Sequence, residues 1–314
     1  MFHKLKTAGI GLTLFFAISM LNACKGDKKE QVSPPSAPDK LRVMVSVPPL
    51  ANLVSKIGGD HVHVDTLVDK GQDPHTFSPS PAQMKTLGMA NILFTVGMPF
   101  EGPLIDKITD TNAGITVADA AAGIEKLELE HHHHEEEDEG EAEGGHDHHD
   151  HDSDPHVWLA PYSIKVQLDN IEKALGAAIP DKAAQFAENL KTAQAELNQA
   201  HEKIKGKLKP FSGRQFFVFH PAFGYFANEY DLEQIAIEIG GNSPTPNELI
   251  GFLAVAKAAK IQIIFIQPQF DPRSAEVIAK ELGAKVAILD PLAPDVMANL
   301  HAITDAIVEG FSGS

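Results

Sequence analysis

Short apolar runs that alternate with stretches of helical periodicity constrain this chain more than any other feature. In the first half, runs of strand character cover residues 42–47, 61–68, 92–96 and 114–117. In the second half, they cover residues 215–219, 234–238, 262–266 and 285–289. Helical patterns lie between them, for example at 50–57, 81–89, 247–259 and 274–282. This alternation predicts an α/β fold with mostly parallel sheets. The two sets of about four strands predict two similar lobes, although no residue-level repeat relates them.

One segment between the two sets has an uninterrupted helical period. Pro180 precedes it and Pro210 follows it, as expected at the ends of a helix. Apolar residues recur every three or four positions, at Ala183, Phe186, Leu190, Ala193, Leu197, Ala200, Ile204 and Leu208. A helix over 181–208 would be about 40 Å long and could run along both lobes as a rigid link. A coiled-coil arm is the alternative, but the run is short and globular sequence flanks it on both sides.

The length of the chain suits this division. About 275 residues follow Lys40, enough for two lobes that each have a core. We therefore expect an N-terminal α/β lobe over 41–180, a linking helix over 181–208 and a C-terminal α/β lobe over 209–314.

A histidine- and acid-rich segment interrupts the first lobe at residues 127–154. It contains eight of the sixteen histidines of the chain, thirteen acids and no Lys or Arg. It therefore supplies −13 of the net charge of −17, and this local acidity argues against a nucleic-acid partner. With few apolar residues, the segment is expected to be disordered. Imidazole suits zinc, copper and nickel, so we interpret the segment as an accessory metal-capture loop, with a solvated polar linker as the alternative. Its histidines are His131, His132, His133, His134, His146, His148, His149 and His151.

The N-terminus predicts export. A basic start is followed by an apolar run over 8–20, which is too short to span a bilayer. Small residues then precede Cys24, the only cysteine, in a pattern that resembles a bacterial lipoprotein signal. We expect residues 1–23 to be a signal peptide, Cys24 to be lipidated and the Pro-rich stretch 24–40 to be a flexible tether. An ordinary secretory signal with a coincidental cysteine is the alternative. A single cysteine also excludes internal disulfides and zinc–thiolate clusters.

Four candidate metal ligands lie outside the low-complexity segment: His75, His156, His220 and Asp290. Each follows a strand or a turn marked by proline, and each is directly next to a proline in the sequence. Ligands of open α/β sheets bind beyond the carboxyl ends of the strands, so four such residues could converge on one cleft. Three imidazoles and one carboxylate are a suitable set for tetrahedral Zn²⁺. Taken one at a time, a histidine near a strand end is more often a structural hydrogen-bonding group. Asp73 and Asp154, which precede two of the histidines, could support them as hydrogen-bond acceptors.

These four segments, in this order, resemble the zinc- and manganese-binding solute receptors of bacterial ABC importers, the cluster A-I family. The long helix, the His-rich loop and the sequence Gly97-Met98-Pro99-Phe100-Glu101 share in the resemblance. It implies two α/β lobes joined by one helix, with the metal held between them by the four candidate ligands. In that family, histidine at the third ligand position goes with zinc and glutamate with manganese, so His220 favours Zn(II). The fourth position is Asp290, water or another carboxylate. Gln267 stands where the family usually has glutamate, so a supporting role for Gln267 stays open.

The resemblance also implies a biological setting. The chain would be a monomeric receptor, not an enzyme, held by a lipid anchor at a bacterial membrane in the periplasm or at the cell surface. It would deliver Zn(II) to an ABC permease that is driven by its ATPase. Three alternatives remain: the same fold with manganese, nickel or copper as cargo; an adhesin or metal-sequestering lipoprotein without a transporter; and a zinc-dependent hydrolase with a His₃ site, for which no H-E-x-x-H motif is present.

Overall fold

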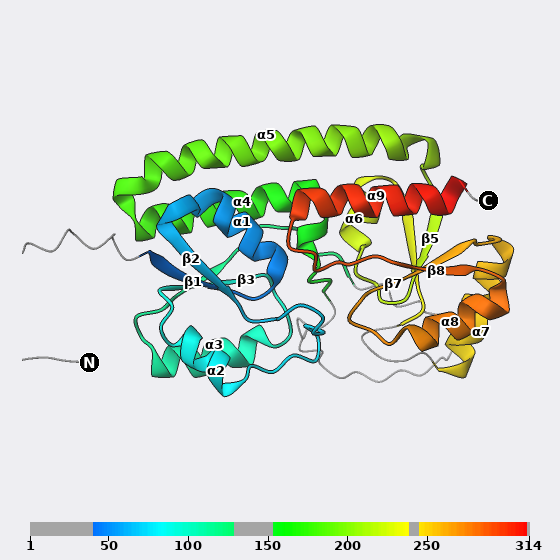
Figure 1. Ribbon diagram of the computed structural model, residues 1–314, viewed down its shortest axis with the longest axis horizontal. Helices are drawn as coiled ribbons and strands as arrows, with labels where there is room; N and C mark the ends of the chain where they lie inside the picture. The colour runs from blue at the N-terminus through cyan, green and yellow to red at the C-terminus, as the bar shows by residue number, and fades with distance from the viewer. Residues whose placement is uncertain (1–39, 129–152, 239–244, 313–314) are drawn as a thin grey trace, which may run out of the picture. The chain divides into compact units, whose positions relative to one another are not determined.

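Two parallel four-stranded sheets form the framework of the protein (Figure 1). The computed structural model describes residues 40–128, 153–238 and 245–312. The first sheet has the order β2-β1-β3-β4 and the second has the order β6-β5-β7-β8. Their strands are β1 (Leu41–Val45), β2 (Val62–Thr66), β3 (Ile92–Thr95), β4 (Thr116–Asp119), β5 (Gln215–Val218), β6 (Glu233–Ala236), β7 (Ile263–Ile266) and β8 (Lys285–Ile288). All eight overlap the strands expected from the sequence, so the predicted α/β class with two sheets is confirmed.

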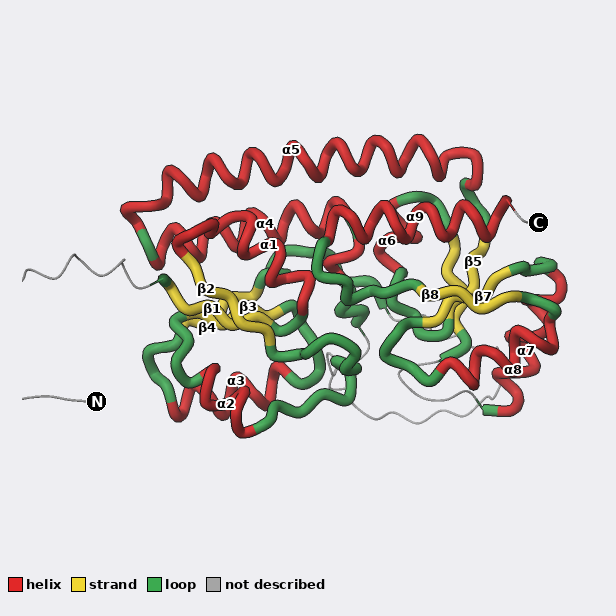
Figure 2. The backbone as a smooth tube through the Cα atoms, in the orientation of Figure 1, coloured by secondary structure: helices red, strands yellow, loops and turns green. Residues whose placement is uncertain are grey.

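Helices cover both faces of each sheet, as parallel sheets require (Figure 2). On one side lie α1 (Pro48–Gly58), α4 (Pro161–Ala178), α5 (Ala183–Leu208), α6 (Gly224–Glu229) and α9 (Val296–Ser312). On the other side, α2 (Pro81–Leu87) and α3 (Glu101–Thr111) cover the first sheet, and α7 (Pro246–Ala258) and α8 (Pro272–Leu282) cover the second.

The 26-residue helix α5 is the long helix predicted from the sequence. Six residues of the expected apolar stripe are buried along it: Phe186, Ala193, Leu197, Ala200, Ile204 and Leu208. The helix packs on α1 and α4 in the first half of the chain and on α9 in the second half. Lys56 of α1 binds Glu196 at 2.6 Å, and Lys207 binds Asp305 of α9. Helix α5 therefore contacts both halves, as a linking helix must.

The hydrophobic core differs from the expectation that each lobe has its own. One continuous cluster includes Phe94 of the first sheet, Phe186 of α5 and Leu300 of α9. A smaller cluster lies between the second sheet and helices α7 and α8. Strand β5 separates the two, because Phe216 and Val218 belong to the first cluster whereas Phe217 belongs to the second. The cores merge because α4, α5 and α9 pack together over both sheets.

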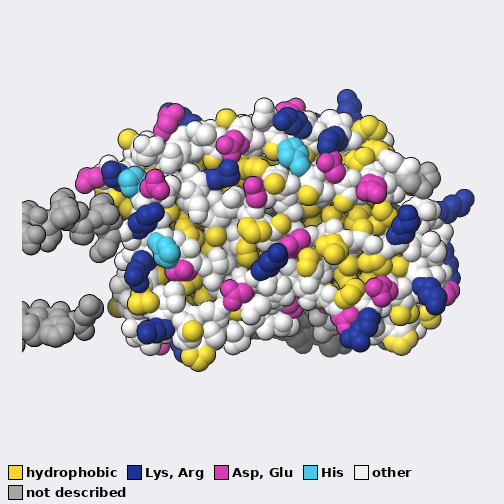
Figure 3. All heavy atoms as spheres, in the orientation of Figure 1, with side chains coloured by type: hydrophobic (Ala, Val, Ile, Leu, Met, Phe, Trp, Pro, Cys, Tyr) yellow, Lys and Arg dark blue, Asp and Glu magenta, His cyan; other side chains and the backbone are white. Residues whose placement is uncertain are grey.

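Several sequence features lie outside the described residues. These are the expected signal peptide, Cys24, nearly all of the expected tether and the eight histidines assigned to the accessory loop. Within the described part, no helix is both long and apolar enough to cross a bilayer. On the face seen in Figure 3, Lys and Arg side chains are interspersed with Asp and Glu, so this face carries no extended field of one sign.

Candidate metal centre

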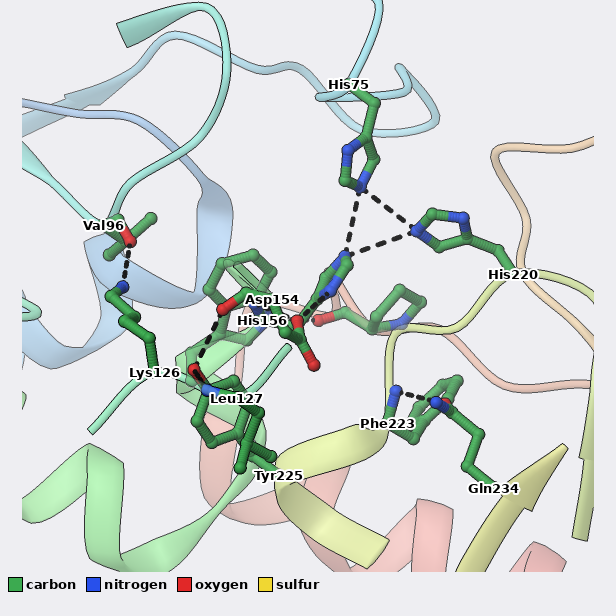
Figure 4. A network of polar contacts seen from close by, with 12 residues as sticks. His75, Val96, Lys126, Leu127, Asp154, His156, His220, Phe223, Tyr225 and Gln234 are labelled. Carbon is green, nitrogen blue, oxygen red and sulfur yellow. Dashed lines mark hydrogen bonds and ion pairs between the residues drawn. The ribbon is translucent and has the colours of Figure 1, made fainter. Parts of the chain in front are cut away.

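Three histidines from distant parts of the chain meet at one point (Figure 4). The Nε2 atom of His75 lies 3.2 Å from Nε2 of His156 and 3.1 Å from Nε2 of His220. The Nε2 atoms of His156 and His220 are 3.4 Å apart. Among the described residues, this is the group of His, Cys, Asp and Glu side chains whose ligand atoms lie close enough to hold one ion.

The spacing of these nitrogens matches a zinc site. With Zn–N bonds of about 2.0–2.1 Å and tetrahedral angles, two nitrogen ligands are about 3.3–3.4 Å apart. The three observed distances, 3.1, 3.2 and 3.4 Å, lie at or just below this value. The rings are therefore placed so that one small cation can contact all three.

Each histidine lies in a connection between a strand and the next α-helix. His75 lies in the loop between β2 and α2, and its backbone N–H donates to Asp73 Oδ1 at 2.9 Å. That loop ends at Ser80, which caps α2 together with Gln83 in a reciprocal capping box. His156 lies between β4 and α4, and His220 comes shortly after β5. These three side chains come together in loops that follow strands, the region where open α/β sheets bind ligands, and their assignment as metal ligands stays a prediction.

Two buried carboxylates orient two of the rings. Asp154 Oδ1 lies 2.7 Å from Nδ1 of His156, and Glu238 Oε2 lies 2.7 Å from Nδ1 of His220. A carboxylate accepts a hydrogen bond, so each Nδ1 carries the proton and each Nε2 presents its lone pair. Two lone pairs then face each other at 3.4 Å, which is repulsive unless a cation lies between them. This arrangement has the chemistry of a metal-binding site.

Glu238 was not identified from the sequence as a functional residue. It follows β6, the neighbour of β5, and its backbone N–H donates to Phe219 O at 2.8 Å. The parallel register aligns Val218 with Ala236, and continuing it by two residues aligns His220 with Glu238. The order of the strands, which the sequence does not reveal, is the signal that would have found it. Asp154 was considered as a possible support, and its side chain does hydrogen-bond to His156.

Burial disfavours the charged form of His75, His156 and Asp154. The pKa of His75 falls from 6.5 to about 3, first because the ring is desolvated and then because His156 and His220 are close. Desolvation also holds the pKa of His156 well below its usual range. Desolvation raises the pKa of Asp154 to about 7. At neutral pH the rings of His75 and His156 are therefore neutral, so a metal can bind them without displacing an additional proton.

The loop after β7 holds His220 from a second direction. Gln267 accepts from the backbone N–H of His220 at 3.1 Å and donates to its carbonyl oxygen at 3.0 Å. Phe270 stacks on the His220 ring, with 5.1 Å between ring centroids. The role of Gln267, left open by the sequence, is therefore to fix the backbone of this histidine.

Asp290 does not join the three histidines. Its Oδ1 accepts from the backbone N–H of Leu292 at 2.9 Å and from Nε2 of Gln269 at 3.2 Å. Asp290 is absent from the group of ligand atoms that lie within 4.8 Å of one another, as far as the described residues go. The assignment of Asp290 as the fourth ligand stays a prediction.

The two ends of the His- and acid-rich segment are joined beside His156. Residues Glu128 and Ser153 form an antiparallel bridge, and Asp154 N–H donates to Leu127 O at 2.7 Å. From α6, the hydroxyl of Tyr225 donates to Asp154 O at 2.9 Å and accepts from Leu127 N–H at 3.1 Å. Desolvation raises the pKa of Tyr225 to about 12, so the hydroxyl keeps its proton. Helix α6 therefore positions the residue that supports His156.

Comparison with known proteins gives the family. The profile described as zinc-uptake complex component A, periplasmic, matches residues 43–310. The chain belongs to this zinc-uptake family. A relative in Bacillus subtilis, the high-affinity zinc uptake system protein ZnuA, is 29% identical over 288 residues, which are 90% of this chain and 88% of the relative.

Solved structures of the family have the same fold. A crystal structure of ZnuA superposes with a TM-score of 0.78 at 37% identity and covers 87% of this chain and 99% of its own. A ZnuA variant that lacks residues 138–173 (in that protein's numbering) and carries bound zinc superposes with a TM-score of 0.77 at 36% identity, over 87% of this chain and 98% of its own. The family expected from the sequence motifs is therefore confirmed.

Proposed function

We propose that this chain is the zinc-binding receptor of a bacterial ABC importer, and that His75, His156 and His220 bind the ion. The observation that carries this proposal is the convergence of three Nε2 atoms within 3.4 Å. Family membership supports the role, because the relatives are named for zinc uptake and zinc binding. The metal is cargo: the receptor captures it outside the inner membrane and delivers it to the permease and its ATPase.

The chemistry of the ligands favours zinc over manganese. Imidazole nitrogen suits zinc, copper and nickel, whereas manganese prefers carboxylate and carbonyl oxygen. In this cluster all three converging atoms are imidazole nitrogens, and the carboxylates of Asp154 and Glu238 are hydrogen-bonded to the Nδ1 atoms of two of the rings. Copper and nickel remain alternatives that a competition experiment must separate.

Two of the three rings are buried, and little space lies over them. His156 and His220 are 2% and 4% exposed. The pocket over the three rings has room for about one water molecule. A zinc hydrolase needs space for substrate beside an open coordination position and a general base. We therefore place the function in binding and transport, with no catalytic residue assigned.

Three finer features belong to the same proposal. Lipidation of Cys24 would tether the receptor to a membrane, and the receptor would act as a monomer. The histidines of the accessory loop would capture or buffer metal near the site. The zinc-bound ZnuA variant that lacks an internal segment supports the view that a tight site does not need such a segment.

Zinc titration of the exported form tests the central claim. We expect one tight site with a stoichiometry of one in a variant that lacks residues 128–153, and additional weaker binding in the full chain. His75→Ala and His220→Ala should each weaken the tight site by orders of magnitude, because each removes one of three protein ligands. His63→Ala is the matched control, since His63 is exposed and lies outside the cluster.

The metal should be identified on protein purified without added zinc, by elemental analysis and by competition among zinc, manganese, nickel and copper. If deletion of residues 128–153 abolished the tight site, the loop would be needed for tight binding, which would contradict the assignment of that site to the three histidines alone. Unchanged affinity in both histidine variants would refute the assignment of the site.

A further inference from the structure

We infer that Glu101 is a positioning residue for His75. It acts through a contact between two aromatic rings, that of Phe100, which precedes Glu101, and that of Phe77 in the His75 loop. The His75 loop covers residues 70–79. The inference rests on the proposed function of His75 as a zinc ligand, and it concerns what keeps this ligand beside the other two rings.

The His75 loop is attached to its surroundings by few polar contacts. Asp73 accepts from the backbone N–H of His75 and from the Thr76 hydroxyl, and both of these bonds lie inside the loop. Within the described residues, no hydrogen bond joins residues 70–79 to a strand or a helix. The ring of His75 meets only the rings of the other two histidines. The position of the loop therefore depends on packing.

Phe77 is the aromatic residue that packs the loop onto the body of the protein. Its side chain is partly buried against the continuous hydrophobic cluster, to which Phe100 belongs. The two rings meet edge to face, with 4.9 Å between their centroids and 68° between their planes. Aromatic pairs in this arrangement stabilise a fold beyond the area that they bury. Since Phe77 lies two residues after His75, this contact limits how far His75 can move.

Glu101 fixes the turn that carries Phe100. Glu101 is the first residue of α3 and is buried. Its carboxylate accepts from the backbone N–H groups of Val96, at 3.1 Å, and Gly97, at 2.7 Å. Its own N–H donates to Met98 O at 3.0 Å, which closes the turn. Gly97 has a φ of +96°, where glycine is favoured. The carboxylate thus sets the path of the backbone that leads to Phe100.

A loosened loop would change how long the protein retains zinc. The three histidines can bind one ion together only while His75 lies beside the other two rings. Apparent affinity falls with the fraction of molecules in which the loop is in that position. Bound zinc also leaves faster when less free energy opposes withdrawal of the loop. Loss of the aromatic pair should therefore speed zinc dissociation about 2- to 10-fold, the factor that corresponds to the extra free energy of one such pair.

The test measures the dissociation of zinc from protein that is loaded with one equivalent of Zn²⁺ and mixed with excess EDTA, at EDTA concentrations where the rate no longer depends on EDTA. The variants are Phe77→Leu, Phe100→Leu, the two combined, Glu101→Gln, and Glu101→Gln combined with Phe77→Leu. Phe252→Leu is the matched control, because the buried ring of Phe252 meets that of Phe217 edge to face in the smaller core, with 5.8 Å between centroids. Urea unfolding of the metal-free variants shows how far each is destabilised.

We expect Phe77→Leu and Phe100→Leu each to speed zinc dissociation about 2- to 10-fold. The double variant should match the faster single variant, because the same contact is lost in all three. Glu101→Gln replaces one of the two acceptor oxygens by a nitrogen that donates, so it should speed dissociation as well. Combined with Phe77→Leu, it should add nothing further. Phe252→Leu should lower stability and leave the rate of dissociation unchanged.

Several results would overturn the inference while leaving zinc binding intact. One is dissociation at the wild-type rate in both phenylalanine variants, or in a folded Glu101→Gln variant. Another is an equal acceleration in Phe252→Leu, which would trace the effect to a general loss of stability. If Glu101→Gln does not fold, Gly97→Ala takes its place, because alanine at a φ of +96° strains the same turn. Absence of tight zinc binding in the wild-type protein would instead refute the proposed function.

Discussion

Replacing Gly224 by alanine should weaken metal binding without touching a ligand. Gly224 is the first residue of α6 and lies against the side chain of Asp154. A Cβ atom at this position would be 2.8 Å from Asp154 Oδ2, closer than Cβ atoms approach other heavy atoms in real structures. Either the carboxylate or the helix must therefore move.

The Asp154 carboxylate cannot move without losing a hydrogen bond to His156. Asp154 Oδ1 accepts from the backbone N–H of His156 at 2.9 Å and from its Nδ1 at 2.7 Å. The backbone of Asp154 is itself held by Leu127 and Tyr225. Rotating the side chain away from the added methyl group breaks a hydrogen bond to a charged group, worth about 1.5–3 kcal/mol. Losing the hydrogen-bond partner of a metal-binding histidine lowers metal affinity roughly 10- to 100-fold. In free energy, that loss is similar to the cost of the broken hydrogen bond.

Gly102→Ala is the matched control. Gly102 lies in the first turn of α3, is exposed, and has open space where a Cβ would be placed. Alanine there should raise stability by about 0.4–1 kcal/mol by restricting the unfolded chain, and should leave zinc affinity unchanged. Both variants are compared by chelator competition for zinc and by urea unfolding of the metal-free protein. A folded Gly224→Ala variant that binds zinc as tightly as the wild type would refute the reasoning that Asp154 must stay on His156.

Three other predictions concern stability, pH and fluorescence. The Tyr225 hydroxyl hydrogen-bonds to the backbone of both Leu127 and Asp154 beside the site. Tyr225→Phe should therefore lower the free energy of unfolding of the metal-free protein by about 1–3 kcal/mol, measured with urea. Tyr162→Phe, at an exposed position, should leave it unchanged. The pKa of His75 is about 3 in the folded protein and 6.5 in the unfolded chain, so between these values the unfolded chain binds more protons and the contribution of His75 to stability falls as the pH drops. The raised pKa of Asp154 has the opposite effect, because its contribution to stability increases as the pH drops. Comparing the melting temperatures of wild type and His75→Gln from pH 7.5 to 4.5 isolates the contribution of His75. A difference that does not depend on pH would contradict the lowered pKa of His75. Trp158 is the only tryptophan, and its ring centroid lies 5.5 Å from that of His156, a proposed ligand, so zinc should change its fluorescence; unchanged fluorescence in a protein shown to have bound zinc would contradict this assignment.

The sequence predicts the elements of this fold well because its signals are local. Each strand is a short apolar run, and the period of α5 is visible over the whole helix. The three histidines could be proposed because the sheets are parallel, which brings residues after the strands to one edge. Bringing them to one point still required a resemblance to a family, since each histidine alone could have been a structural hydrogen-bonding group.

What the sequence could not predict depends on the order of strands and on helix packing. Glu238 reaches His220 only because β6 lies next to β5, and Gln267 reaches the same histidine because β7 lies on the other side. The shared core depends on how α4, α5 and α9 pack over both sheets, which no single segment reveals. Asp290 was chosen for its position after β8, but the structure pairs its carboxylate with Leu292 N–H and Gln269.

The three histidines are held with unequal strength, and this bears on how the ion leaves. His220 is fixed by groups from two neighbouring strands, through Glu238 and Gln267. His156 is fixed by Asp154, whose backbone is tied to α6. His75 is held by the backbone contact to Asp73 within its own loop, and among the described residues its Nδ1 atom has no hydrogen-bond partner. Since one continuous core spans both sheets, we expect the ion to leave by withdrawal of the His75 loop and not by separation of the sheets.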